Sequence, residues 1–189
     1  MQTKKKKVTW QAAAWSGRED LTLQVGDAGI EATSELKGTT EDGTPYEIRY
    51  TIELSPDWQV QHVHIADSRD EGGTLDLIYE NGQWFAGLDD YLGEEFDNVP
   101  FIDISLTPFT NTIPIKHLTF EGREPQKIDV LFIDLPSFTW RRVEQYYSKI
   151  GENTYHYQDI ERPDFQADIV VDDDGLVLVY PNLFTAAVA

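Results

Sequence analysis

Short runs of alternating polar and apolar residues, separated by turn residues, cover most of the chain. In the clearest run, every second residue is apolar or aromatic: Tyr46, Ile48, Tyr50, Ile52 and Leu54. Such side chains share one face of a strand. The pair Asn81-Gly82 between two further runs is typical of a β-hairpin turn. About eleven such runs at roughly 8–12-residue spacing predict an all-β domain.

The strand pattern also bears on the architecture. Residues 128–133 carry apolar side chains on both faces of a predicted strand. A strand of this kind is typical of the centre of a sandwich, or of a sheet curved around an apolar interior. We therefore expect an antiparallel curved sheet that forms a barrel or half-barrel, with little helix. Neither a repeat nor a linker interrupts the sequence, so residues 9–185 are predicted to form a single β-barrel-like domain after a disordered basic tail, 1–8.

The stretch 103–118 stands out within this pattern. Residues 103–106 and 113–120 are predicted strands, joined by a loop over 107–112. Pro108 and Pro114 favour extended conformations in the residues before them and disfavour a helix. Phe109 is a large apolar residue in this polar loop, so we expect it to pack inward or onto a ligand.

The same stretch resembles the signature of a bacterial glycolipid-binding family, Thr-Pro-Phe-Thr-Asn-Thr-Leu-Pro-Ile-Arg-Arg-Leu. Here Ile113 replaces the leucine, and Lys116 and His117 replace the two arginines. The similarity continues downstream through segments such as Tyr155-His156-Tyr157 and Tyr180-Pro181, and it is thinner upstream. The resemblance implies a fold like that of lipoprotein carriers, an incomplete barrel that encloses an apolar cavity, and a glycolipid or other amphipathic small molecule as the ligand.

The predicted binding residues come from the segments that match this family best. Aromatic rings are expected to line the cavity and polar groups to hold a head group at its mouth: Phe109, Tyr146, Tyr155 and Tyr157 for the rings, and Thr110, Asn111, Lys116 and His117 for the polar groups. If the two arginines of the family bind a head group, this protein is expected to bind that group less tightly or to bind a different one.

Composition and charge exclude several classes of function. The formal net charge of −19 opposes binding to nucleic acid and is compatible with a high-salt environment. The absence of cysteine excludes disulfides, a thiol nucleophile and cysteine-based metal sites. No apolar run reaches the roughly 20 residues of a transmembrane helix. Lys4–Lys7 could begin a signal peptide, but Gln11 interrupts the apolar segment that follows, so a cytoplasmic protein is expected.

Candidate catalytic and metal-binding groups each have a simpler interpretation. His62 and His64 could share a metal, but a hydrogen-bonded surface pair is favoured. The run 172–174 before Gly175 lacks the spacing of a calcium loop and fits a hairpin turn. Asp103 and Asp134 interrupt apolar strand positions and are expected to pair with Lys116, Arg141 or Arg142.

These observations predict a non-catalytic protein, without cofactor or metal, that binds an amphipathic ligand in a barrel cavity. Two alternatives stay open. One is a hydrolase or isomerase that uses Asp103 or His117 in the barrel mouth. The other is a partner-binding domain with a filled core. The sequence does not determine the oligomeric state.

Overall fold

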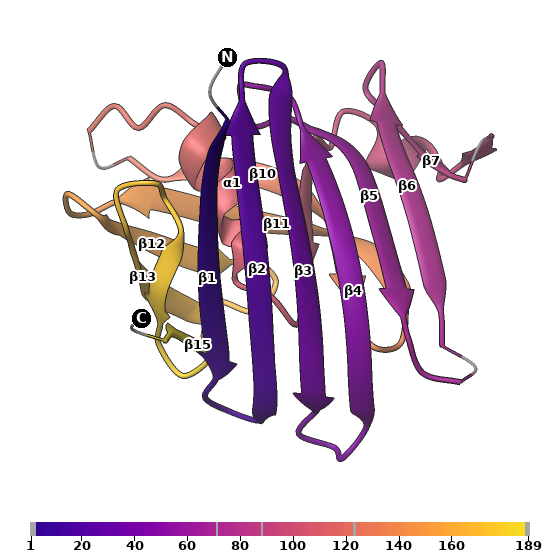
Figure 1. Ribbon diagram of the computed structural model, residues 1–189. Helices are drawn as coiled ribbons and strands as arrows, with labels where there is room; N and C mark the ends of the chain where they lie inside the picture. Colours follow the sequence, from indigo (N-terminus) through magenta and orange to yellow (C-terminus); the bar gives the residue numbers. More distant parts are fainter. Residues whose placement is uncertain (1–2, 71, 88, 123, 188–189) are drawn as a thin grey trace.

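A computed structural model describes residues 3–70, 72–87, 89–122 and 124–187. The first half of the chain forms consecutive antiparallel strands that lie side by side (Figure 1). They are β1 (Lys4–Ala12), β2 (Ser16–Gly26), β3 (Gly29–Thr39), β4 (Pro45–Leu54), β5 (Val60–Asp67), β6 (Thr74–Glu80), β7 (Gln83–Ala86) and β8 (Asp90–Tyr91). A short 3-10 helix, η1 (Glu94–Phe96), follows them.

The second half extends the same sheet from its other side. Its elements are β9 (Phe101–Ile104), α1 (Phe109–His117), β10 (Gln126–Asp134), β11 (Thr139–Lys149), β12 (Thr154–Asp159), β13 (Gln166–Val171), β14 (Val177–Tyr180) and β15 (Phe184–Ala186). β15 pairs with β1, with Trp10 opposite Ala186, so the two halves join into a sheet of 15 strands.

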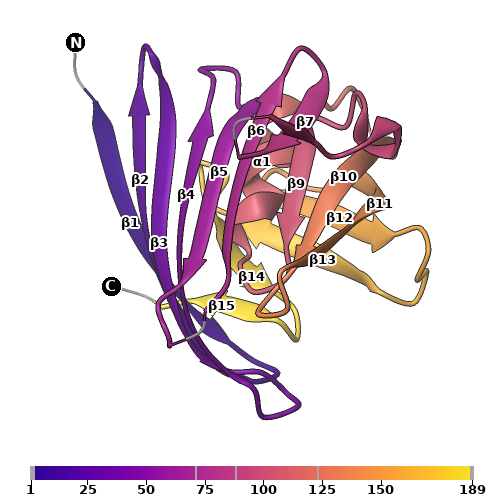
Figure 2. The same ribbon diagram turned by 90° about the vertical axis from the view of Figure 1, so that its right-hand side faces the viewer.

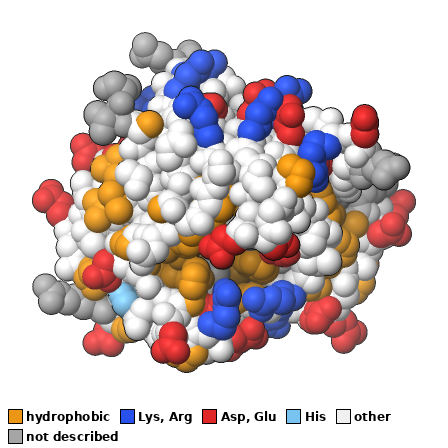
Figure 3. Space-filling view, turned by 90° about the horizontal axis from the view of Figure 1, so that it is seen from below, with side chains coloured by type: hydrophobic (Ala, Val, Ile, Leu, Met, Phe, Trp, Pro, Cys, Tyr) orange, Lys and Arg blue, Asp and Glu red, His pale blue; other side chains and the backbone are white. Residues whose placement is uncertain are grey.

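The sheet curves around α1 without closing, because β8 and β9 form its two edges. In the side view, strands from the first half lie on one side of α1 and β9–β13 on the other (Figure 2). The prediction of an all-β half-barrel is therefore confirmed. Seen from below, at the end where the β1–β2 and β3–β4 turns lie, the molecule is hollowed near its centre (Figure 3).

The local pattern predicted several elements correctly. The alternating side chains of β4 are all buried on one face. Asn81 and Gly82 both have positive φ, at 53° and 83°, as the tight turn between β6 and β7 requires.

The prediction for 107–118 was wrong, because Phe109–His117 is a helix rather than a loop and a strand. Pro108 directly precedes the first helical residue, where its fixed φ fits and no N–H is needed. Pro114 lies inside the helix, at a cost of about 3 kcal/mol in an isolated helix. Burial offsets that cost, since Phe109 to Ile115 are all buried between the two halves of the sheet.

The topology explains why a helix is needed at this point. β9 and β10 are parallel, with Val130 opposite Phe101 and Leu131 opposite Ile102. Adjacent parallel strands require a crossover connection, which is usually helical, and α1 lies in this one. The prediction of a wholly antiparallel sheet was therefore wrong at this edge.

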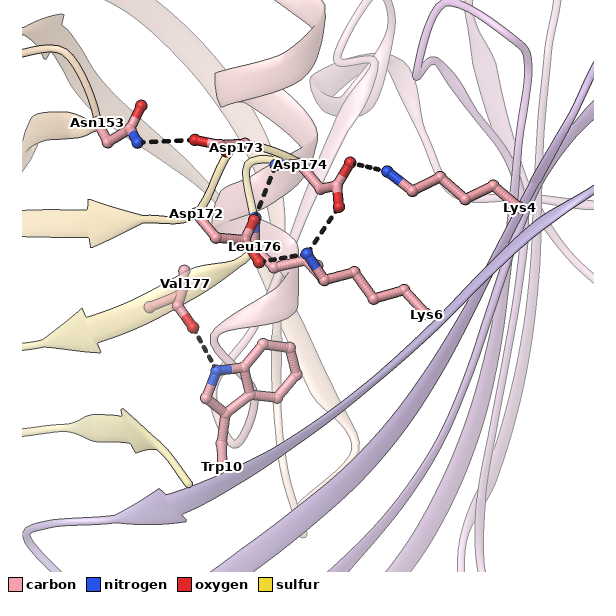
Figure 4. Close-up of polar contacts among 9 residues, drawn as sticks. All are labelled: Lys4, Lys6, Trp10, Asn153, Asp172, Asp173, Asp174, Leu176 and Val177. Atoms are coloured by element: carbon pink, nitrogen blue, oxygen red, sulfur yellow. Dashed lines mark hydrogen bonds and ion pairs between the residues drawn. The ribbon is translucent and has the colours of Figure 1, made fainter. Parts of the chain in front are cut away.

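The expected disordered tail was also wrong over the part that the structure describes, because β1 begins at Lys4. Lys4 to Lys7 pair in register with Val25 to Thr22 of β2. Lys6 Nζ bonds Asp172 at 2.5 Å and Asp174 at 2.7 Å, and Lys4 also bonds Asp174 (Figure 4). The β13–β14 turn thus supplies the charges that hold a basic strand in place.

Candidate functional site

A cavity of about 430 Å³ opens at the underside of the half-barrel. Its wall combines aromatic rings with polar side chains, and apolar, acidic and basic groups are all visible around the hollow in Figure 3. The lining residues come from both halves of the sheet and from α1. They include Trp15, Glu41, Asp103, Ser105, Thr107, Asn111, Phe132, Asp134, Val143, Gln145, Tyr157, Asp159, Arg162, Phe165, Tyr180, Leu183 and Phe184.

The polar part of the wall is a bonded group that spans β9, β11 and α1. Asp103 Oδ2 accepts a hydrogen bond from Gln145 Nε2 at 2.7 Å, and its Oδ1 accepts one from Thr110 Oγ1 at 3.1 Å. Asn111 Nδ2 donates to the Tyr147 hydroxyl at 2.8 Å. Gln145 and Asn111 are both buried residues, so their orientations are fixed by packing as well as by these bonds.

Among the acidic side chains of this wall, Asp103 has a pKa that is clearly raised. Burial raises the pKa of its carboxyl group, and the nearby Asp159 carboxylate acts in the same direction. The hydrogen bonds from Gln145 and Thr110 lower the pKa and offset part of that rise. The expected ion pairs were wrong for this residue, since its side-chain partners are neutral. Arg141 instead pairs with Glu161, and Arg142 with Asp129.

A buried carboxylate and an arginine form one edge of the mouth. Asp159 Oδ2 accepts from Arg162 Nε at 2.9 Å and lies 2.8 Å from its Nη2. The side chain of Asp159 is almost fully buried, whereas that of Arg162 is 55% exposed. The Arg162 guanidinium lies 4.8 Å from the ring centre of Phe165. The arginine is therefore held at the mouth with its charge already paired.

Neutral aromatic rings form another part of the wall, next to Arg162. Tyr157 makes edge contacts with Tyr147, Phe165 and Tyr180, with ring centres 5.4, 6.1 and 6.0 Å away. Burial raises the pKa of the Tyr157 and Tyr180 hydroxyls, so both remain uncharged at neutral pH. Trp15 meets Phe184 edge-on at 5.2 Å. Such rings provide flat apolar faces with hydroxyl groups at their edges.

Two of the predicted binding residues line this cavity, namely Asn111 and Tyr157. Thr110 lies next to it through its bond to Asp103. Phe109 is fully buried in the core, where its ring stacks on Tyr50 with 6.5 Å between ring centres. Phe109 therefore packs inward, as one of the two expectations had it.

The other four predicted residues lie outside the cavity lining. Lys116 Nζ lies over the Trp58 ring, 5.8 Å from its centre, and His117 Nδ1 is 2.7 Å from the backbone oxygen of Asp57. Tyr155 packs edge-on against Phe120. Tyr146 alternates with the buried residues of β11 and so faces the other side of the sheet. Their roles in binding stay predictions.

The sequence signals other lining residues only where a polar residue interrupts the apolar face of a strand. Gln145 is a polar residue between Val143 and Tyr147 on the buried face of β11. Asp159 likewise follows Tyr155 and Tyr157 on the buried face of β12. Polar groups at such positions are normally bonded, and here they form the site. Arg162 lies in a loop and carries no comparable signal.

A second buried acid lies behind the cavity wall. Glu19 Oε1 accepts hydrogen bonds from Tyr50, Ser34 and Thr107 at 2.6, 2.7 and 2.9 Å. Its Oε2 is buried and has no hydrogen-bond partner among the described residues. Burial raises the pKa of Glu19 to about 7. Because Thr107 also lines the cavity, Glu19 is linked to the site through its hydrogen bond with Thr107.

The histidine pair and the aspartate turn have the simpler roles expected of them. His62 and His64 both lie within hydrogen-bonding distance of Asp76, at 3.1 and 2.9 Å. Asp172 Oδ1 accepts from the backbone N–H of Asp174 and Leu176, as in a hairpin turn. No group of three or more acidic, histidine or cysteine side chains that could hold a metal occurs among the residues described.

Comparison with known families shows the family to which the chain belongs. The profile of the family described as "Putative glycolipid-binding" matches residues 7–186. The chain belongs to this family. The match runs from within β1 to the end of β15 and includes every residue that lines the cavity.

One solved structure is closely similar to this chain. The 1.80 Å crystal structure of a DUF1089 family protein from Pseudomonas aeruginosa has 31% sequence identity and a TM-score of 0.81. The alignment covers 90% of this chain and 91% of that one, so most of the half-barrel is shared. No protein with a curated description matches the chain. Within the described ranges, no helix is long and apolar enough to cross a membrane.

Proposed function

We propose that this protein binds one amphipathic small molecule, of the glycolipid class indicated by its family, in the underside cavity and does not alter it chemically. The observation that carries this proposal is a cavity of about 430 Å³ whose wall has both aromatic rings and fixed polar groups. That volume lies in the range of small-molecule sites, roughly 300–1,000 Å³. Helix α1 fills the core, as expected of a partner-binding domain, but the cavity beside Asn111 remains as a site for a small molecule.

Catalysis is the second candidate, and Asp103 is the residue that favours it. A raised pKa in a cavity is typical of general acids, and Asp159 lies near enough to affect that pKa. However, both Asp103 oxygens already accept hydrogen bonds, from Gln145 and from Thr110. Such a fixed carboxyl group fits a binding wall better than a proton donor. His117, the other catalytic candidate, does not line the cavity.

Uptake of a fluorescent glycolipid, measured with a cavity-blocking variant, tests the binding proposal. Leu183 lines the cavity, whereas Leu178 is an exposed residue of β14. We expect Leu183→Trp to abolish uptake because the indole occupies the space of the ligand, and we expect the matched Leu178→Trp to bind as wild type does. Equal uptake by both variants would place the ligand elsewhere.

Two further measurements complete the test. Native mass spectrometry of protein purified without detergent, followed by solvent extraction, should reveal a co-purifying glycolipid. Incubation of the protein with that lipid should leave it intact. Release of sugar by wild type but not by Asp103→Asn would favour the hydrolase, and failure to take up any amphiphile would remove the binding proposal.

A further inference from the structure

The buried wall of the cavity carries fixed polar groups, unlike the wall of a pocket for a lipid tail. Its buried wall carries Asp103, Gln145, Asn111 and Thr107, which are polar and fixed by hydrogen bonds. Its most exposed aromatic lining residue is Phe165, which is 36% exposed. Polar groups therefore share the buried wall with the rings of Tyr157, Tyr180 and Phe184, and an apolar ring also lies at the mouth.

The apolar interior of the half-barrel is already occupied. Helix α1 fills the space between the two halves of the sheet, and Phe109 and Ile113 are completely buried there. An alkyl chain that entered this region would have to displace the helix. The open space that remains lies beside Asn111, toward the underside of the molecule.

A second hollow continues the mouth along the sheet. It has a volume of about 340 Å³ and shares Phe132, Asp134 and Arg162 with the cavity. Trp140 also lines it, with 40% of its surface exposed. Phe132 and Trp140 thus offer two apolar rings at the surface, beside polar groups that include Arg141, whose guanidinium lies 5.1 Å from the ring centre of Phe132.

The charges around the cavity discriminate between head groups. Four carboxyl side chains line it, those of Glu41, Asp103, Asp134 and Asp159, against the single guanidinium of Arg162. Asp159 already pairs with that guanidinium at 2.8 Å. A phosphate, sulfate or carboxylate would therefore meet net repulsion, whereas an uncharged head group would not.

The hydrogen-bonding groups of the wall are those that suit hydroxyl groups. Asn111 and Gln145 use their amide N–H groups within the protein, which leaves both carbonyl oxygens to accept from a ligand. The hydroxyls of Tyr157 and Tyr180 can donate or accept beside them. Sugar hydroxyls both donate and accept, and sugar rings pack on aromatic faces.

We propose that the ligand binds head-first, with an uncharged, hydroxyl-rich head group inside the cavity and its alkyl chain along Phe132 and Trp140 at the surface. This inference rests on the proposed function and adds the chemical class and the orientation of the ligand. It makes Gln145 a head-group contact and Trp140 a chain contact.

Calorimetric titration with soluble probes separates the contribution of the head group to affinity from that of the alkyl chain. The probes are octyl and decyl β-glucoside, galactoside and maltoside, the corresponding methyl glycosides, and octanoate and octyl sulfate, all below their micellar concentrations. We expect at least one octyl glycoside to bind, its methyl counterpart to compete with it, and both anions to bind at least about tenfold more weakly. Each methylene added to the chain should raise affinity by less than the roughly fourfold expected for full burial.

Two variants assign the contacts. Gln145→Leu should weaken methyl and octyl glycosides alike, by roughly five- to tenfold, because both lose the same hydrogen bond. Trp140→Ala should weaken the octyl glycoside and leave the methyl glycoside unchanged. Tyr91→Ala removes an equally exposed ring from β8, outside the cavity and the second hollow, and is the matched control.

The outcomes distinguish this inference from the proposed function. Tight binding of octanoate or octyl sulfate, with about fourfold gain per methylene and no effect of Gln145→Leu, would mean chain-first binding. That result would overturn the inference and leave the proposed function standing. If none of the probes binds and no lipid co-purifies, both fall together.

Discussion

At the scale of single residues, Glu19 connects the sheet to the loop that begins α1. Its Oε1 bonds Ser34 of β3, Tyr50 of β4 and Thr107, and the Thr107 hydroxyl in turn accepts from the backbone N–H of Phe109 at 3.0 Å. A carboxyl group enclosed in this way is costly to ionise. The structure therefore implies a stability that depends on the protonation of this one residue.

The pH dependence of unfolding follows from the direction of the shift. Burial raises the pKa of Glu19 from 4.5 to about 7, with an added rise from the nearby Asp20 carboxylate. The folded protein therefore holds this proton more tightly than the unfolded chain, and the resulting stability is complete below about pH 4.5 and is lost as pH rises through about 7. The shift in pKa corresponds to a change of about 3 kcal/mol in the free energy of unfolding.

Glu19→Gln tests this prediction, because glutamine has the same shape and never ionises. We expect the free energy of unfolding of the variant, measured with urea between pH 4.5 and 8, to gain on that of wild type as pH rises. Asp103 also has a raised pKa and adds to the slope in both proteins, so the difference between them isolates Glu19. A difference that stays constant over this range would contradict the prediction.

At the scale of elements, the sequence predicts those whose signals are local. The alternation in 46–54 defines β4 because one face of that strand packs on the core, and Asn81-Gly82 defines a turn because both residues tolerate positive φ. Helix α1 was missed because Pro114 argues against a helix locally, whereas burial on all sides favours one. The requirement for a crossover between parallel β9 and β10 is not visible in any window of sequence.

Strand β1 shows the same limit and leads to the second prediction. Four consecutive lysines indicate a solvated tail, yet Lys6 bonds two aspartates of a turn that lies more than 160 positions away in sequence. The hydrogen bonds from Lys4 and Lys6 hold the pKa of Asp174 at about 2. This ionic cluster joins the first strand to the last part of the sheet, beside the buried Trp10, whose Nε1 donates to Val177 O (Figure 4).

Removing Lys6 should loosen that junction. We expect Lys6→Ala to lower the free energy of unfolding by about 1 kcal/mol at low ionic strength and by much less in 1 M salt, where the screening length is about 3 Å. Lys7→Ala removes the same charge from an exposed neighbouring position and serves as the control. An equal loss in both variants would mean that net charge, and not the contact with Asp172 and Asp174, is responsible.

At the scale of the whole molecule, the curvature of the sheet decides what the site can be. The half-barrel was predictable, since strands apolar on both faces need an interior and a cover. The pairing of β15 with β1 was not, because it joins segments from opposite ends of the chain, with Gln11 opposite Thr185. That pairing brings Trp15 and Phe184 together at the cavity, so this part of the site depends on a contact that no local pattern encodes.

The net charge of −19 is also a property of the whole molecule. Its repulsion acts between many exposed carboxylates and is screened as salt is added, whereas the attraction at Lys6 is a single local cluster. The long-range term involves more charges, so it should dominate the response to salt. We expect the melting temperature to rise by about 3–6 °C between 10 mM and 1 M sodium chloride, which corresponds to roughly 1–2 kcal/mol.

A charge-reduced variant separates this repulsion from other effects of salt. Asp27, Glu80, Asp90 and Glu152 are exposed and belong to none of the ion pairs found in the described chain. Their replacement by the corresponding amides makes the net charge less negative by four units without changing side-chain shape. The variant should melt higher than wild type in low salt and gain less from added salt. If its salt dependence equals that of wild type, the increase has another cause, and the acidic surface imposes no requirement for salt.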